Sequence, residues 1–195
     1  LMDFNCEQRN NVHFFYTLPF TKKKALIETT WISNLDDDSL KDYDLQLERY
    51  IKEKLEIKKY KINYTEKGAI PLFYKNFKNE SNKINIGSAG NMTRLSTGYT
   101  FLNIQEHSRY RTKNIDVIKN VKKYKINKKY QFLDGVFLNV LEKYPEKMPN
   151  IFFNMFMNSS NTAIKFLSNK SNIFEDFLII FKMPIWIFIK TLFKN

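Results

Sequence analysis

The sequence predicts an α+β fold in which a mixed sheet is followed by a helical C-terminal region. Short runs of aromatic and β-branched residues occupy the first third of the chain, which is typical of strands. From Gln131 onward, apolar residues instead recur at helical spacing, and prolines punctuate the pattern at Pro145, Pro149 and Pro184. With 195 residues, the chain is long enough to bury a hydrophobic core.

The first third predicts a β-hairpin, a helix and a further strand. Residues 13–18 and 25–32 form two strand-like runs joined by a connection that contains proline and lysine. A helix is expected over about 37–55, because apolar residues recur there at helical spacing behind three aspartates. At 60–64, tyrosine and isoleucine alternate with polar residues, which predicts a third strand.

The middle of the chain predicts a short strand at 84–86 that ends at Gly87, followed by a helix capped by Thr97. The stretch Arg109–Lys129 holds nine Lys or Arg and a single acid. Beyond it, helices are expected in three apolar stretches, at 131–141, 151–166 and 174–193.

The composition excludes several kinds of site. One cysteine, Cys6, rules out a disulfide framework and a cysteine-based zinc site. The two histidines, His13 and His107, lie far apart in the sequence, so no metal centre is expected. Burial in the core is the favoured interpretation for Cys6, and a structural role is favoured for both histidines.

Two features could carry chemistry. Gly87-Ser-Ala-Gly90, followed by Ser-Thr-Gly98, could bring backbone N–H groups close to a phosphate, although a simple tight turn explains the same residues. The chain contains no G-x-G-x-x-G, so the main pyrophosphate loop of a bound dinucleotide is expected outside it. Glu28 lies within an aromatic strand. Burial would disfavour its charged form and suit it to proton transfer, and exposure on an edge strand is the alternative.

The net charge of +12 predicts a surface that attracts anions. For Arg109–Lys129, a solvated loop is the first interpretation and contact with anionic lipid headgroups the second. No nucleic-acid-binding motif accompanies this stretch, so nucleic acid is not an expected partner. The apolar segment 174–193 is interrupted by charges and by Pro184, so it is expected to lie on a membrane surface or to cap a core rather than to span a bilayer.

The sequence resembles the flavin-dependent lycopene cyclases of carotenoid synthesis. The resemblance runs in order along essentially the whole chain, and the Leu-Pro-Phe, Ile-Glu-Thr-Thr and Thr-Gly-Tyr motifs are specific in combination. The segments that carry it are Leu1–Phe4, Phe14–Phe20, Ala25–Thr30, Glu66–Pro71, Ile86–Tyr99, Phe132–Gly135, Leu141–Glu146 and Phe166–Ser168, followed by the proline-interrupted apolar tail.

The resemblance implies the C-terminal part of a two-domain FAD-dependent flavoprotein related to aromatic hydroxylases and geranylgeranyl reductases. Within it, 1–82 would supply strands and a helix of the substrate domain, 83–112 a returning FAD-contacting segment, and 113–195 a basic loop and the helical region. The chain opens with Leu1, and this piece alone is expected to be inactive and to hold FAD weakly.

The resemblance also implies the reaction, a redox-neutral, acid/base cyclisation of the ψ ends of lycopene to β-ionone rings. The enzyme would be an isomerase that needs reduced FAD, with NAD(P)H as reductant, at the cytoplasmic surface of a membrane. Glu28 matches the family's catalytic acid, and Ser88 stands where many relatives have an acid. The implied cofactor-binding residues are Gly87, Ser88, Ala89, Gly90, Asn91, Met92, Thr93, Gly98 and Tyr99.

Two other functions remain open from the sequence. One is a reductase or monooxygenase of the same flavoprotein superfamily that acts on another isoprenoid or aromatic substrate. The other is a non-catalytic, basic module that binds membrane surfaces. The acid at Glu28 distinguishes a cyclase from both of these functions, because only a proton-transfer cyclase requires an acid at that position.

Overall fold

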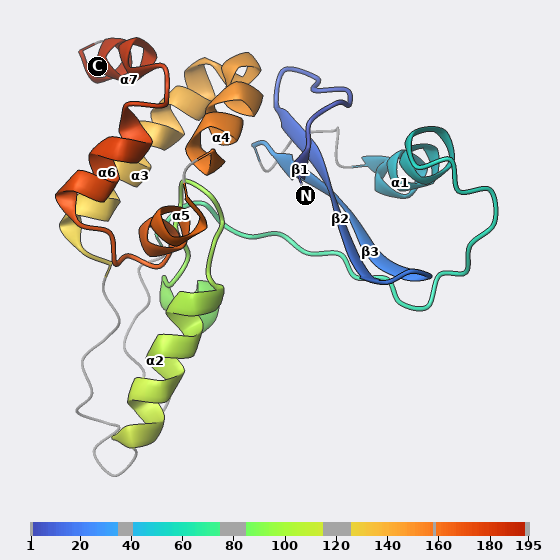
Figure 1. The fold of residues 1–195 in the computed structure, drawn as a ribbon, viewed down its shortest axis with the longest axis horizontal. Helices are drawn as coiled ribbons and strands as arrows, with labels where there is room; N and C mark the ends of the chain where they lie inside the picture. Colours follow the sequence, from blue (N-terminus) through green and yellow to red (C-terminus); the bar gives the residue numbers. More distant parts are fainter. Residues whose placement is uncertain (1, 35–40, 75–84, 115–125, 158, 194–195) are drawn as a thin grey trace. The chain divides into compact units, whose positions relative to one another are not determined.

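A computed structural model describes residues 2–34, 41–74, 85–114, 126–157 and 159–193. These residues form an α+β structure with a three-stranded sheet and seven α-helices (Figure 1). The chain divides into two compact units, each described by itself below. The N-terminal unit comprises residues 1–67 and 144–149, and the C-terminal unit comprises 68–143 and 150–195.

The sheet of the N-terminal unit has the order β1-β2-β3, with β1 (Met2–Asp3), β2 (Val12–Thr21) and β3 (Lys24–Ile32). The predicted hairpin is confirmed as β2 and β3. The predicted mixed sheet is wrong for the described residues, because both pairings are antiparallel. A tight connection such as the one between β2 and β3 can join only antiparallel strands, whereas a parallel pair needs a long crossover.

One face of the sheet is covered by a helix. Helix α1 (Tyr43–Arg49) continues as a π-helical turn (Tyr50–Lys54), where Tyr50 stacks on Phe15 of β2 with ring centroids 3.9 Å apart. The helix was expected from about residue 37, but residues 37–40 lie outside the described chain and α1 begins only after Asp42. The Asp42 carboxylate accepts two hydrogen bonds from Arg9, at 2.9 and 3.1 Å, which joins the start of α1 to the loop before β2.

Two other sequence predictions fail. Residues 60–64 form no strand, and their side chains are exposed. An alternating pattern produces a strand only when a neighbouring strand supplies hydrogen-bond partners, and none of the described strands pairs with this segment. Of the predicted strand at 84–86, Ile84 lies outside the described residues. Asn85 and Ile86 are not in a strand, because the Ile86 carbonyl instead accepts a hydrogen bond from the Gly90 N–H.

The helices after residue 100 agree with the sequence prediction in position but not always in length. The long stretch predicted at 151–166 is divided in two, and Ser159 caps the second helix by accepting a hydrogen bond from Thr162. Pro184 separates the last two helices. The helices are α2 (Phe101–Lys113), α3 (Lys128–Lys143), α4 (Met148–Phe156), α5 (Ser160–Leu167), α6 (Ile173–Ile180) and α7 (Ile185–Leu192).

The core of the C-terminal unit lies between α3 and the helices that pack on it. Phe137 of α3 makes an edge-to-face contact with Phe152 at 5.4 Å and a tilted contact with Phe188 of α7 at 6.2 Å, measured between ring centroids. Val140 and Ile151 are fully buried beside them. Because aromatic and aliphatic burial provides most of the stability of such a core, α3 is a firm support for polar groups attached to it.

Candidate functional site

Glu28 lies in the middle of β3, directly opposite Tyr16 of β2. Its side chain is on the sheet face that α1 does not cover, and it is exposed, so of the two alternatives that the sequence left open, burial and exposure, the structure shows exposure. The hydroxyl group of Thr30 donates a hydrogen bond of 2.8 Å to Oε1 of Glu28. β3 is one of the two edge strands of the described sheet, and the exposed Glu28 carboxylate is accessible to a ligand.

The residues around Glu28 are mostly apolar. We call this surface the Glu28 face; it comprises Phe14, Tyr16, Leu18, Leu26, Glu28 and Thr30. Burial raises the pKa of Tyr16, and the negative charge of Glu28 raises it further, so the phenol stays protonated at neutral pH. A carboxylate, a neutral phenol and a hydroxyl group therefore lie together on a surface that suits a hydrocarbon.

The opposite side of the sheet holds a pocket of about 200 Å³ between the strands and α1. Glu28 does not line it. Within the pocket wall, His13 stacks on Trp31, and its Nδ1 and Nε2 lie 2.8 Å from the Glu7 carbonyl and the Thr29 hydroxyl. Burial lowers the pKa of His13, which is consistent with the structural role predicted for it.

Cys6 also lines this pocket, and its thiol donates to the His13 carbonyl at 3.3 Å. Burial raises the pKa of Cys6 to about 11. A thiol with so high a pKa carries almost no thiolate at neutral pH and is a poor nucleophile. Cys6 is only partly buried, so the predicted core position is wrong, whereas its raised pKa agrees with the prediction that it is not a nucleophile.

The glycine-bearing segment of the C-terminal unit forms a tight turn. Gly87–Gly90 is a 3₁₀ turn with Gly87 at φ +62°, and a Cβ on Gly90 would lie 2.7 Å from the Asn85 carbonyl oxygen. These two positions therefore require glycine. Ala89 is exposed, and Gly87, Ser88 and Gly90 are partly exposed. A turn of this kind can bring backbone N–H groups close to an anionic or hydroxyl group, such as part of a dinucleotide.

The remaining residues that were predicted to bind the cofactor differ in how far they are buried. Met92 and Thr93 are buried, so protein atoms surround their side chains. The Thr93 hydroxyl donates to Ser88 Oγ at 3.0 Å and thereby holds the 3₁₀ turn. Gly98, at φ +70°, and Tyr99 close a second turn, in which the N–H of Gly98 donates to the Arg94 carbonyl and the N–H of Arg94 to the Tyr99 carbonyl. This turn replaces the predicted Thr97 cap, and α2 begins later, after Thr100.

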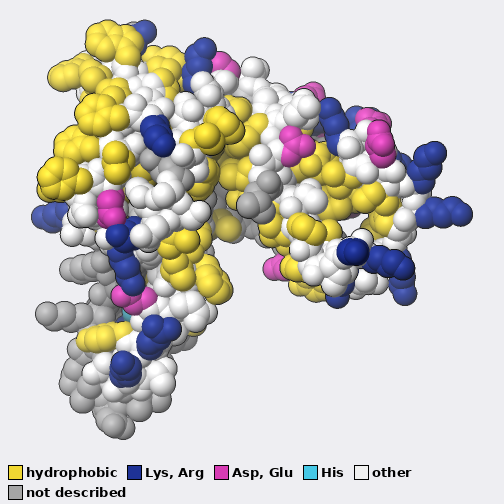
Figure 2. Space-filling model, in the orientation of Figure 1, with side chains coloured by type: hydrophobic (Ala, Val, Ile, Leu, Met, Phe, Trp, Pro, Cys, Tyr) yellow, Lys and Arg dark blue, Asp and Glu magenta, His cyan; other side chains and the backbone are white. Residues whose placement is uncertain are grey.

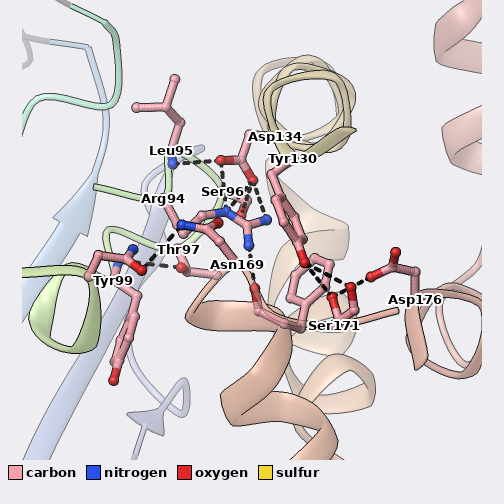
Figure 3. Close-up of polar contacts among 12 residues, drawn as sticks. Arg94, Leu95, Ser96, Thr97, Tyr99, Tyr130, Asp134, Asn169, Ser171 and Asp176 are labelled. Carbon is pink, nitrogen blue, oxygen red and sulfur yellow. Dashed lines mark hydrogen bonds and ion pairs between the residues drawn. The ribbon is translucent and has the colours of Figure 1, made fainter. Parts of the chain in front are cut away.

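Arg94 anchors this segment to the core (Figure 3). Both Arg94 and Asp134 of α3 are completely buried, and Nε and Nη2 of Arg94 donate to the Asp134 carboxylate at 2.7–3.1 Å. The guanidinium lies 4.6 Å from the ring centroids of both Tyr130 and Phe166, and its Nη1 donates to the Phe166 carbonyl. The guanidinium therefore has both charged and aromatic partners.

Asp134 also accepts hydrogen bonds from the backbone N–H of Leu95 at 3.0 Å and from the hydroxyl group of Ser96 at 2.7 Å. One carboxylate on α3 thus binds three consecutive residues that follow the glycine turn (Figure 3). Nearby, the Tyr130 hydroxyl donates to the Ser171 carbonyl at 3.0 Å, which links α3 to the loop before α6. Through Asp134 of α3 and the Phe166 carbonyl of α5, the segment from Gly87 to Tyr99 is attached to two helices of the core.

Comparison with known proteins gives one decisive result. The family described as Lycopene cyclase protein matches residues 1–192. The chain belongs to the lycopene cyclase family. No curated protein and no solved structure gives a significant match. Membership supports a function in carotenoid cyclisation in general, implies a carotenoid substrate, and confirms the resemblance found in the sequence.

In this lycopene cyclase family member, sequence reasoning did not find the partners of Glu28 or the Arg94–Asp134 pair. A signal for the pair exists, because Asp134 lies on the apolar side of α3 between Tyr130 and Phe137. Among the residues that the structure describes, no three His, Cys, Asp or Glu side chains are grouped to hold a metal. Within the same residues, every helix is too short or too polar to cross a bilayer.

Proposed function

We propose that this protein is a lycopene β-cyclase, an isomerase that converts the ψ ends of lycopene to β-ionone rings. The observation that carries the proposal is the position of Glu28, which lies on an apolar sheet face with Tyr16 opposite it and Thr30 bonded to it. Family membership supports the same substrate class. A reductase or a monooxygenase would need no acid at this position.

In the proposed reaction, protonated Glu28 transfers its proton to the terminal double bond of the ψ end. The resulting carbocation is attacked by a second double bond, which forms the ring carbon–carbon bond. A neighbouring ring carbon then loses a proton to a carboxylate, so product and substrate have the same atoms and the same electron count. Tyr16 remains protonated and its aromatic ring faces the same surface as Glu28, which suits it to stabilise a nearby cation.

An exposed carboxylate is a weak acid catalyst until water is removed from it. The hydrocarbon substrate would supply this cover by lying across the Glu28 face. Leu18 and Leu26 pair with each other beside Tyr16 and Glu28, and Leu26 is partly exposed, so the strands offer apolar contacts next to the acid. Substrate binding and activation of Glu28 would therefore be one event.

Reduced FAD is part of the proposal, with NAD(P)H as its reductant. The backbone of the Gly87–Gly90 turn and the Ser88 hydroxyl would hold its polar portion, and Gly87, Gly90 and Gly98 would allow close backbone approach. When bound, reduced FAD would supply an electron-rich ring system without a net change of oxidation state. Met92 and Thr93 would act by supporting the turn rather than by direct contact, because they are buried.

The test is pigment analysis after expression of the complete gene in lycopene-accumulating cells. We expect β-carotene or γ-carotene from the parent gene and unchanged lycopene from Glu28→Gln, with flavin still bound. Glu48→Gln is the matched control, because Glu48 is exposed on α1 and pairs only with Lys52 among the described residues. Cyclic product from Glu28→Gln would contradict the assignment of the acid, and a reduced or hydroxylated product would favour the reductase or monooxygenase.

A second test concerns residues 1–195 expressed alone. We expect residues 1–195 alone to hold flavin weakly and to be inactive, since no G-x-G-x-x-G occurs in the sequence. The flavin absorption of the purified chain measures this directly. A stoichiometric flavin spectrum would contradict the expectation.

A further inference from the structure

The last two helices of the C-terminal unit present their apolar residues to solvent. On α6, the exposed residues recur at helical spacing and form one stripe, made up of Ile173, Phe174, Phe177, Leu178 and Phe181. Phe174 is 81% exposed. The opposite side of α6 is buried through Asp176 and Ile179. A surface helix normally places its apolar stripe against the core, so this stripe lacks an ordinary structural explanation.

Helix α7 repeats the arrangement. Trp186, Ile189 and Phe193 recur at intervals of three and four residues and are exposed, and Trp186 is 74% exposed. Apolar side chains gather over both helices in Figure 2, at the left and top of the view. Single exposed apolar residues are common on proteins, but two aromatic stripes on successive helices mark an interaction site. We call this surface, formed by the two stripes, the α6–α7 face.

The charges on these helices are positive once internal pairs are counted. Glu175 is paired with Lys165 at 2.5 Å, and Asp176 is paired with Lys129 at 2.6 Å. Lys182 and Lys190 are exposed and form no ion pair with any described residue. Lys182 donates a hydrogen bond to the Met157 carbonyl at 3.0 Å but has no carboxylate partner among the described residues. An aromatic surface with exposed lysines beside it matches an anionic lipid interface, into which aromatic rings insert while ammonium groups reach the headgroups.

We infer that the α6–α7 face inserts into the headgroup region of an anionic lipid bilayer. Charge complementarity favours a bilayer over a second copy of the chain, because a symmetric dimer would bring equal positive charges together. A carotenoid hydrocarbon dissolves in the bilayer and not in water, so an enzyme acting on it gains access to substrate there. The inference rests on the proposed function for its substrate, and it assigns the membrane attachment expected from the sequence to particular side chains.

The test follows Trp186 with lipid vesicles of phosphatidylcholine, with and without phosphatidylglycerol. The chain has two tryptophans, so Trp31→Phe leaves Trp186 as the only tryptophan fluorophore. We expect the emission of Trp186 to shift to shorter wavelength when anionic vesicles are added, and to be quenched by brominated acyl chains. If Trp31→Phe fails to fold, the parent chain and Trp186→Phe are compared, and the same changes should be present only in the parent.

Replacement of Phe177 and Phe181 by serine is expected to weaken vesicle partitioning by about tenfold or more. The matched control is Phe20→Ser, because Phe20 is 63% exposed at the end of β2 and far from α6 in the sequence; it should leave partitioning unchanged. Lys182→Gln and Lys190→Gln should each lower partitioning to anionic vesicles about fivefold, with a smaller effect at high salt.

Three outcomes would overturn the inference. The first is vesicle binding without a change in Trp186 emission, and the second is an equal loss for Phe20→Ser. The third is a Trp186 shift that depends on protein concentration without vesicles, which would indicate a second copy as the occupant. Because the vesicles contain neither flavin nor lycopene, failure here leaves the cyclase proposal standing, and loss of cyclisation by Glu28→Gln leaves this test unaffected.

Discussion

The two candidate sites, one in each unit, are held in opposite ways. Glu28 is exposed on an edge strand, and a single described hydrogen bond, from Thr30, orients its carboxylate. The segment Gly87–Tyr99 is instead attached to the core by Arg94 and Asp134, which are completely buried. The group proposed to move a proton is accessible, whereas the segment proposed to contact the cofactor is fixed.

This difference has an energetic reason. A buried ion pair gives little net stability compared with apolar residues, but loss of one partner leaves an uncompensated charge in the core. The Arg94–Asp134 pair therefore specifies one position for the residues after the glycine turn. An exposed carboxylate carries no such penalty, so Glu28 can lose its charge when a substrate covers it without endangering the fold.

The largest effect is expected from Asp134→Ala. The substitution removes the partner of a fully buried guanidinium and the acceptor for Leu95 and Ser96, so we expect the free energy of unfolding to fall by about 3–5 kcal/mol. Urea denaturation, followed by circular dichroism, measures the change. Unaltered stability would contradict the view that this pair anchors the segment.

The matched control for that substitution is Glu106→Gln. Glu106 pairs with Lys170 at 3.2 Å, and both side chains are 57% exposed. Because solvent screens an exposed pair, the expected change is below about 1 kcal/mol. Two ion pairs in the same unit should therefore differ severalfold in effect, because Asp134 is buried and also accepts hydrogen bonds from Leu95 and Ser96, whereas Glu106 is exposed.

A smaller effect is expected on catalysis from Thr30→Val. This substitution keeps the shape of the side chain but removes the hydroxyl group that orients Glu28, so kcat should fall about tenfold while KM for lycopene stays unchanged. Thr30→Ser restores a donor and should recover most of the rate. Equal losses for valine and serine would indicate a packing role and not a role in positioning the acid.

Some of these features could be predicted from the sequence because they depend on local pattern. The β2–β3 hairpin follows from two strand-like runs with a short connection, and the helices after residue 128 follow from long apolar periodicity. The segment 60–64 has an equally good strand pattern, yet it forms no strand. A strand needs a partner, and no local pattern contains that information.

The same limit of local sequence patterns applies to the candidate site. Alternation in β3 places Glu28 and Thr30 on one face, but it does not tell which face a helix covers, so burial of Glu28 could not be decided. Arg94 and Asp134 are 40 positions apart in the sequence, and their pairing depends on the packing of α3. In the local sequence, only the position of Asp134 on the apolar side of α3 indicates that a buried partner exists.

A still smaller effect is expected on the pH dependence of stability, through His13 on the pocket side of the sheet. Burial lowers the pKa of His13, so below about pH 6.5 the unfolded chain binds a proton that the folded chain resists. This contribution to stability is fully present above that pH and is lost as the pH falls below it. The difference in unfolding free energy between about pH 7.5 and about pH 5.5 should therefore be smaller in His13→Gln. An identical pH dependence in parent and variant would show that His13 does not contribute.

Glu28→Gln, which should have the largest effect on cyclisation, is expected to have the smallest effect on stability. Glu28→Gln keeps the size of the side chain and still accepts the hydrogen bond from Thr30, and its exposed position involves no buried charge. The free energy of unfolding should therefore change by less than about 0.5 kcal/mol, measured by urea denaturation in parallel with Asp134→Ala. A large loss of stability would mean that the carboxylate supports the sheet, and loss of cyclisation in that variant could then be due to unfolding. Unchanged stability together with lost cyclisation would show that the exposed acid is needed for the reaction and not for the stability of the fold.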